Sequence, residues 1–157
     1  MFKTLIKDRF LVTIVSVLFC TALHSQPSND TKLLEELIGS LNEGVNTRDY
    51  AKVLDVFAHP SALIYSVHNG VFAGTYASES NTAQGLADFI QTTDKEVRQN
   101  FENIRVSIVS PGRAVVTTHY SVLLDGENSH QGDEYYSAIK TKSGWKFISL
   151  MFTLETF

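Results

Sequence analysis

The sequence predicts an α+β fold in which N-terminal helices pack on the concave face of a strongly curved antiparallel sheet. Apolar residues recur at helical spacing only within the first 90 residues, whereas alternating segments separated by turn motifs fill residues 101–154. The chain has 157 residues, 43% of them hydrophobic, which is the size of one compact domain with a core. We therefore expect a single domain over residues 26–157.

The first 25 residues have the three-part pattern of a secretory signal peptide. Lys3, Lys7 and Arg9 form a positive region, an apolar run follows at residues 10–19, and the segment before Ser25 is less hydrophobic. The apolar run is shorter than the roughly 20 residues that a transmembrane helix needs. We expect cleavage after Ser25, giving a secreted or periplasmic protein that does not insert into a membrane.

Cys20 raises the alternative of a lipid anchor. Phe19 stands before it, where a lipoprotein signal has a small residue, and this favours a cysteine that belongs only to the discarded apolar segment. Cleavage nearer Ala22 is a further alternative. Once the segment is removed, the mature chain has no cysteine, and so no disulfide, thiol nucleophile or thiolate-bound metal.

The charge makes nucleic acid an unfavourable partner. The chain has 13 Lys and Arg against 17 Asp and Glu, a formal net charge of -4, and its basic residues form no cluster after the N-terminus. Binding to phosphates needs concentrated positive charge. We expect a mildly acidic domain with no nucleic-acid partner.

Two helices are expected at the start of the domain. Residues 33–45 carry one apolar stripe, and a capping residue is available at 28–30. The polar segment 46–49 interrupts this stripe, and a second, shorter helix follows over residues 50–57. Pro60 ends it, because a proline disfavours helical geometry in the residue before it.

The spacing of the apolar residues changes from a helical to a strand pattern after Pro60. Residues 62–67 are typical of a strand, residues 68–70 of a turn, and residues 71–76 of a short returning strand. A third helix then begins, with Asn81 or Thr82 as its cap, and its apolar stripe ends near residue 90.

Long strands fill the rest of the chain. Their connections carry Pro-Gly, Asp-Gly and Ser-Gly turn motifs and are short enough to make neighbouring strands antiparallel. The expected strands are residues 101–109, 113–124, 132–142 and 145–154. Together with the helices they complete the α+β architecture.

This order of elements resembles the nuclear transport factor 2-like superfamily, in particular its SnoaL-like and ketosteroid-isomerase-like members. The resemblance covers the whole expected domain and is carried by residues 45–58, similar to the family's second helix, and by Gly144 to Ile148, similar to the start of its last strand. It implies a cystatin-like cone, in which the curved sheet surrounds a pocket closed by the helices. It also implies a homodimer that pairs the outer faces of two sheets.

The resemblance does not imply one particular reaction. The superfamily contains isomerases, cyclases, dehydratases and epoxide hydrolases besides members that only bind. Enzymes of this kind move a proton with a pocket carboxylate or histidine. The strand Leu63 to Val67 has no Asp where isomerase-like members place their base, and Met151 stands where some relatives have a histidine.

The strand Arg113 to Leu124 contains the polar cluster TTHYSVLL, which holds the main candidate residues. His119 is the candidate general acid or base because imidazole titrates near neutral pH, and Asp133 is a candidate to orient it or to act as a base. The expected ligand-binding residues are Tyr65, His119, Ser121, Tyr135 and Tyr136.

Strand register decides which of these residues act together. A turn centred between Glu127 and Asn128 would place His119 opposite Tyr136, and a one-residue shift would place Tyr135 on its face instead. Alternation puts His119 and Tyr120 on opposite faces, and we expect the half that carries His119 to face the pocket. No histidine pair has the spacing of a metal site, so no metal and no cofactor are expected.

Three functions remain open. The first is an exported protein that binds a small hydrophobic molecule in an apolar pocket. The second is a cofactor-free lyase, isomerase or hydrolase that uses His119 as general acid or base. The third is a non-catalytic structural dimer, in which cross-strand hydrogen bonds satisfy the polar residues around His119.

Overall fold

The computed structural model describes residues 28–68, 71–72 and 81–157. The predicted signal peptide, Cys20 and part of the second expected strand, residues 73–76, lie outside these ranges and stay predictions. The described elements follow the expected order of two helices, two strands, one helix and four long strands.

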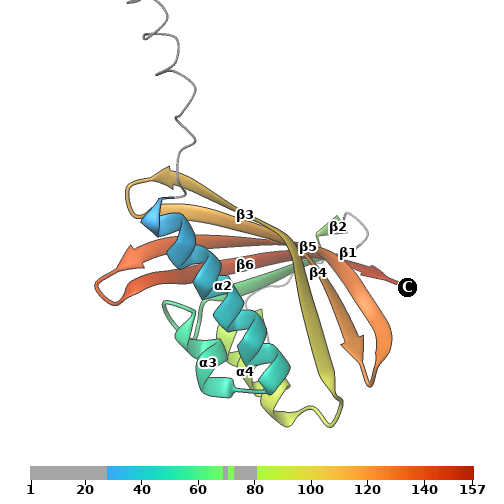
Figure 1. Ribbon diagram of the computed structural model, residues 1–157. Helices are drawn as coiled ribbons and strands as arrows, with labels where there is room; N and C mark the ends of the chain where they lie inside the picture. Colours follow the sequence, from blue (N-terminus) through green and yellow to red (C-terminus); the bar gives the residue numbers. More distant parts are fainter. Residues whose placement is uncertain (1–27, 69–70, 73–80) are drawn as a thin grey trace, which may run out of the picture.

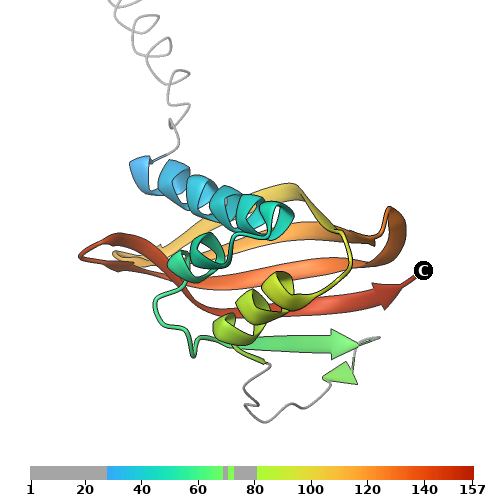
Figure 2. The same ribbon diagram turned by 90° about the horizontal axis from the view of Figure 1, so that it is seen from below.

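The helices begin at the predicted capping residues. Helix α2 spans Asn29–Thr47, α3 spans Tyr50–Asp55 and α4 spans Ala83–Thr92. The side chains of Ser28, Asp49 and Thr82 each accept a hydrogen bond from a backbone N–H in the first turn of the helix that follows. All three helices lie on one face of the sheet, and the long strands bend around them (Figures 1 and 2).

The sheet has six strands in the order β2-β1-β6-β5-β4-β3. Their bounds are Leu63–His68 (β1), Val71–Phe72 (β2), Val97–Ser110 (β3), Arg113–Leu124 (β4), Glu127–Thr141 (β5) and Gly144–Thr156 (β6). All neighbouring pairs are antiparallel except one, since β1 runs parallel to β6. The expected antiparallel pairing holds wherever a short turn joins two neighbouring strands, and β1 departs from it because no hairpin connects it to β6.

The register of β4 on β5 differs from both expected registers. The hairpin turns at Asp125 and Gly126, which both have positive φ, and a β-bulge near the turn shifts the register between Val122 and Leu123 of β4. His119 therefore pairs with Asp133 and lies opposite neither Tyr136 nor Ser137, the two partners expected for it. The shorter turn and the bulge together explain the shift.

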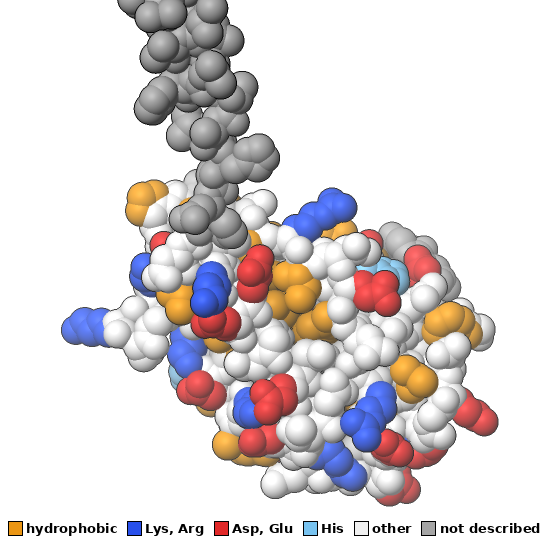
Figure 3. All heavy atoms as spheres, viewed as in Figure 1, with side chains coloured by type: hydrophobic (Ala, Val, Ile, Leu, Met, Phe, Trp, Pro, Cys, Tyr) orange, Lys and Arg blue, Asp and Glu red, His pale blue; other side chains and the backbone are white. Residues whose placement is uncertain are grey.

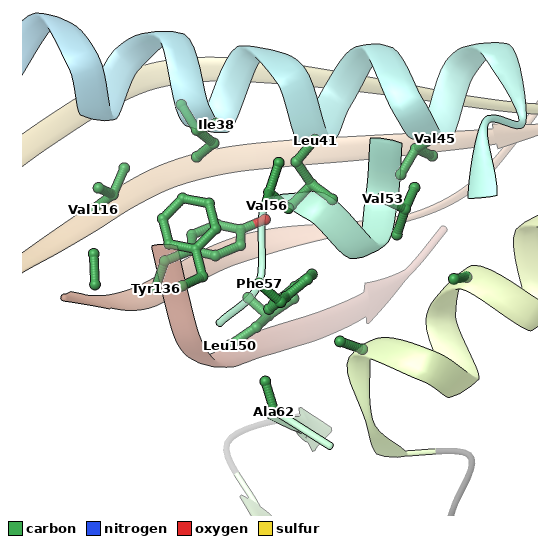
Figure 4. Close-up of a cluster of buried hydrophobic side chains, with 14 of the residues drawn as sticks. Ile38, Leu41, Val45, Val53, Val56, Phe57, Ala62, Val116, Tyr136 and Leu150 are labelled. Carbon is green, nitrogen blue, oxygen red and sulfur yellow. The ribbon is translucent and has the colours of Figure 1, made fainter. Parts of the chain in front are cut away.

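The core lies between the helices and the concave face of the sheet. Ile38, Leu41 and Val45 of α2 point toward the sheet, from which Val116 and Tyr136 point back (Figure 4). These side chains are at most 3% exposed. Their burial, at about 25 cal/mol per Å² of apolar area, is the main force that holds α2 on the sheet.

The surface shown in Figure 3 has acidic and basic side chains interspersed, with no large area of one sign. This agrees with the small net charge of the chain. No described helix is both long and apolar enough to cross a bilayer.

Candidate functional site

A cavity of about 390 Å³ lies between the helices and the concave face of the sheet. We call it the inner pocket. Most of its walls are apolar, and they come from α2, α4 and every strand from β3 to β6 as well as β1. The apolar residues that line it are Leu41, Val45, Ile64, Leu86, Phe89, Ile90, Val97, Val122, Leu124, Leu150 and Phe152. Phe89 on α4 is half exposed and therefore lies toward the solvent side of this pocket.

One carboxyl group faces this apolar cavity. Glu134 of β5 lines the inner pocket and is only 4% exposed. Its Oε1 accepts a hydrogen bond from Gln99 Nε2 at 3.2 Å, and its Oε2 accepts one from the hydroxyl of Tyr136. Both donors are neutral and also line the pocket. Glu134 is thus a buried acid held by hydrogen bonds within an apolar space.

Burial changes the titration of this group. Loss of hydration raises the pKa of Glu134 to about 7, although the hydrogen bonds from Tyr136 and Gln99 act in the opposite direction. The same burial, together with the neighbouring Glu134 charge, raises the pKa of Tyr136 well above its ordinary value. Tyr136 therefore remains a neutral donor, while Glu134 is able to gain or lose a proton near neutral pH.

Gln99 is held in place by a side chain at the end of helix α2. Asn46, at the end of α2, accepts from Gln99 N at 2.7 Å with its Oδ1 and donates to Gln99 O at 2.8 Å with its Nδ2. This pair of bonds joins the helix to the start of β3. It holds the backbone from which the Gln99 side chain reaches Glu134.

The other polar groups of the pocket are fixed as neutral donors or acceptors. The hydroxyl of Tyr120 donates to Thr153 O at 2.8 Å, and burial raises its pKa far from neutrality. His130 packs edge-on against Tyr120, with ring centres 5.8 Å apart, and burial lowers its pKa. His130 is therefore held in the uncharged form at neutral pH.

His119 does not reach the inner pocket. Its Nδ1 lies 3.0 Å from Asp133 Oδ1, so the two predicted catalytic residues are in contact, but on the opposite, convex face of the sheet. They line a groove of about 420 Å³, the outer groove, together with Asn103, Arg105, Thr117, Thr118 and Tyr135. The expectation that the half of β4 with His119 faces the pocket is wrong, because the half with Tyr120 and Val122 buries more apolar surface.

The five predicted ligand-binding residues divide between the two faces. Tyr136 lines the inner pocket, whereas His119 and Tyr135 line the outer groove. Tyr65 and Ser121 line neither cavity, and each alternates along its strand with a pocket residue, Ile64 or Tyr120. The shared face of Tyr135 and His119 follows from the register of β4 on β5.

Glu134 and Gln99 were missed at the level of sequence. A signal for Glu134 was available, because it lies between Gly132 and Tyr136 on the alternating face that continues to Ala138. An acidic residue in an otherwise small or apolar half of a central strand indicates a buried carboxyl group. No equivalent signal marks Gln99, whose burial depends on contacts with β5.

No group of three or more His, Cys, Asp or Glu side chains that could hold a metal ion occurs within the part of the chain that the structure describes. Among the described residues that line the inner pocket there is one carboxyl group, of Glu134, and one imidazole, of His130. The arrangement fits an organic ligand with one polar group.

Comparison with models of known protein families and with curated proteins finds no match. Solved structures do match. A protein of the nuclear transport factor 2-like family from Streptomyces avermitilis, for which dehydratase activity has been suggested, superposes with a TM-score of 0.64 at 14% identity, covering 83% of this chain and 99% of that one. The chain has the nuclear transport factor 2-like fold.

Two further structures with this fold support the assignment. A domain of unknown function with a cystatin-like fold from Nostoc punctiforme has a TM-score of 0.62 at 19% identity, covering 84% of this chain and 81% of that one. A nuclear transport factor 2-like protein of unknown function from Shewanella baltica has a TM-score of 0.59 at 16% identity, covering 85% and 100%. The predicted cystatin-like α+β class is therefore confirmed, and at these identities the similarity concerns the fold alone.

Proposed function

We propose that the protein binds a small, largely apolar molecule in the inner pocket, with one polar group of the ligand hydrogen-bonded to Glu134. The observation that carries this proposal is a nearly fully buried carboxyl group at the wall of an otherwise apolar cavity. Pockets for small molecules combine apolar walls with a few placed polar groups that fix the orientation of the ligand.

The energetics of Glu134 support a functional role. A carboxylate removed from water loses several kcal/mol of hydration, and neutral hydrogen bonds restore only part of it. Raising a pKa from 4.5 to about 7 corresponds to about 3 kcal/mol against folding when the group is ionised. An apolar side chain at this position would serve the core better, so the carboxyl group is better explained by a ligand than by stability.

Proton transfer is the second candidate function, and the same residue supports it. A carboxyl group with a pKa of about 7 is suited to act as general base or acid at neutral pH, and the Tyr136 hydroxyl beside it is a hydrogen-bond donor. Glu134, rather than His119, would then be the catalytic residue. Glu134→Gln separates the two functions. In an enzyme it should abolish the reaction, whereas in a protein that only binds it should alter the affinity for the ligand.

Export and a homodimer also remain proposals. Tyr135 and Met151 are partners across β5 and β6 and are about 40% exposed on the convex face, which no described helix covers. Apolar side chains on an open sheet face support pairing with a second copy. Native mass spectrometry of the secreted material, with sequencing of its mature N-terminus, would test dimer formation and cleavage together.

The binding proposal is tested with the neutral fluorescent probe N-phenyl-1-naphthylamine. We expect saturable binding of one probe per chain, and we expect Leu86→Trp on α4 to weaken it at least tenfold because the larger ring fills the inner pocket. Gln91→Trp is the matched control, since Gln91 is an exposed residue of the same helix that does not line the pocket. Absence of binding, or equal binding by Leu86→Trp and Gln91→Trp with native circular dichroism, would refute the proposal.

A further inference from the structure

The inner pocket has an unbalanced set of ionisable groups. Among the described residues that line it, none is Lys or Arg, and the ionisable ones are Glu134, His130, Tyr120 and Tyr136. The two tyrosines and the histidine are held neutral at pH 7 by burial. Any charge that these described residues bring to the pocket at pH 7 is therefore negative and resides on Glu134.

Nothing described in the protein neutralises this charge. The hydrogen-bond partners of Glu134 are the amide of Gln99 and the hydroxyl of Tyr136, and no ion pair involves Glu134 within the described residues. Both carboxylate oxygens accept a hydrogen bond, as in the ionised form, and neither bond supplies a positive charge. The buried carboxylate thus has hydrogen-bond partners but no counter-ion.

A ligand is able to supply the missing positive charge. Opposite charges attract far more strongly in a pocket of low polarity than in water, and like charges repel by a similar amount. The aromatic rings of Tyr120, Phe152 and Phe89 also line this space, and faces of such rings attract organic cations. An apolar anion, such as a fatty acid, would meet Glu134 with no cation to receive its carboxylate.

We infer that the inner pocket selects small hydrophobic amines, bound as the ammonium with its charge against Glu134 and its apolar part among the side chains of α4, β4 and β6. The inference rests on the proposed function and names the ligand class of the same site. It goes beyond that proposal because a neutral or anionic apolar molecule would satisfy the cavity equally well by shape.

The pH dependence of amine binding follows from the groups around Glu134. Gln99 faces it from β3, Tyr136 from its own strand and Tyr120 from β4, while His130 of β5 lines the same pocket; all of these are neutral at pH 7. Outside the pocket, Glu155 adds only negative charge near Tyr120. Affinity for an ammonium should therefore rise as Glu134 ionises near pH 7, whereas affinity for a neutral ligand should not.

Three probes with the same eight-carbon chain test the inference: 1-octylamine, 1-octanol and octanoate, each titrated calorimetrically at pH 8. We expect octylamine to bind at least tenfold more tightly than octanol, and octanoate to bind most weakly. In Glu134→Gln the preference for octylamine over octanol should disappear. Asp133→Asn is the matched control, because Asp133 is the adjacent carboxylate on the opposite face, and it should keep the preference.

The outcomes separate this inference from the proposed function. If octanol binds the unaltered protein as tightly as octylamine, or if Glu134→Gln keeps the preference, the amine selectivity is wrong while pocket binding stands. If no probe binds, N-phenyl-1-naphthylamine included, the proposed function itself fails. If Glu134→Gln does not fold, the test is made on the unaltered protein. The ratio of its octylamine affinity to its octanol affinity should then rise about tenfold from pH 5.5 to pH 8, and a ratio that does not change with pH overturns the inference.

Discussion

Two neighbouring carboxyl groups lie in very different environments on the two faces of the β4–β5 hairpin. Glu134 points to the concave face, is 4% exposed and has a pKa raised to about 7, whereas the side chain of Asp133 is 56% exposed and contacts His119 in the outer groove. The residues are adjacent in sequence and are both acidic. Burial rather than residue type therefore decides which of the two polar clusters is chemically unusual.

The same contrast holds for energetics. The exposed pair of His119 and Asp133 is worth about 0–1 kcal/mol, because solvent screens it. The buried carboxyl group of Glu134 opposes folding when it is ionised, and its removal should change the free energy of unfolding by a large amount. Substitutions on the two faces therefore provide a direct test of the comparison.

The largest effect is expected for Gly132→Ala on the concave face of β5. A Cβ at this position would lie 2.2 Å from the backbone oxygen of Thr153, so a strand must move. We expect a loss of about 3 kcal/mol or more in the free energy of unfolding, measured by urea denaturation. Ser121→Ala on the convex side of β4 should change it by less than about 0.5 kcal/mol. A small effect of Gly132→Ala would mean that β5 and β6 pack less tightly than described.

Glu134→Gln should remove a pH dependence of about 3 kcal/mol. The pKa of Glu134 is about 7 in the folded chain against an ordinary 4.5, so between these values the folded state keeps a proton that the unfolded state has lost. This contribution to stability is full below pH 4.5, falls as the pH rises and is lost above about pH 7. We therefore expect the variant to be more stable than the unaltered protein at pH 8.

Urea denaturation between pH 4 and pH 8 measures this difference. Asp133→Asn serves as the control and should not reproduce it, since Asp133 is exposed. If the unaltered protein and Glu134→Gln have parallel pH profiles, Glu134 is not a buried acid with a raised pKa.

Asn46→Ala should lower the free energy of unfolding by about 2 kcal/mol. It removes the two bonds that satisfy the backbone N–H and C=O of Gln99, which is 9% exposed. The loss should also loosen Gln99 from Glu134 and weaken ligand binding. Asn42→Ala is the control on the same helix, because within the described part of the chain the Asn42 side chain accepts one long hydrogen bond, of 3.4 Å, from Asn46. Equal effects of the two substitutions would show that the link from α2 to β3 is unimportant.

The smallest effect is expected for His119→Gln on the convex face. The side chain of His119 is 39% exposed, and among the described residues it forms a hydrogen bond with Asp133, so stability should change by less than about 1 kcal/mol. Binding of N-phenyl-1-naphthylamine should stay within about twofold of the unaltered protein. A large loss of binding in His119→Gln would place the outer groove, rather than the inner pocket, at the centre of function.

Local features of this fold were predictable from the sequence, and long-range ones were not. The caps Ser28, Asp49 and Thr82 and both bounds of β4 agree with the sequence pattern, because each depends on a few neighbouring residues. The register of His119 was missed, since it depends on a two-residue turn and a bulge that shift the pairing without changing the alternation.

The candidate site was predicted only in part for the same reason. Tyr136 was expected at the pocket and lies there, and the contact of Asp133 with His119 was expected as well. From the sequence, the more polar half of β4, with His119, was expected on the pocket face of the sheet. Burial of Tyr120 and Val122 places the other half there. The alternation of β5 marks Glu134 as a buried acid, but its partner Gln99 comes from β3, and no local pattern reveals that contact.

The parallel pairing of β1 with β6 has a consequence for the order of folding. Leu63 of β1 pairs with Ser149 of β6, and just before β1 the backbone N–H of Ala58 donates to Phe147 O. The long strand that pairs with β1 is therefore the last one in the chain. Such distant contacts form late, whereas β3, β4 and β5 are joined by short hairpins. During synthesis, β1 must wait until the last strand has emerged, and pulse-labelling hydrogen exchange should find its amides protected after those of β4.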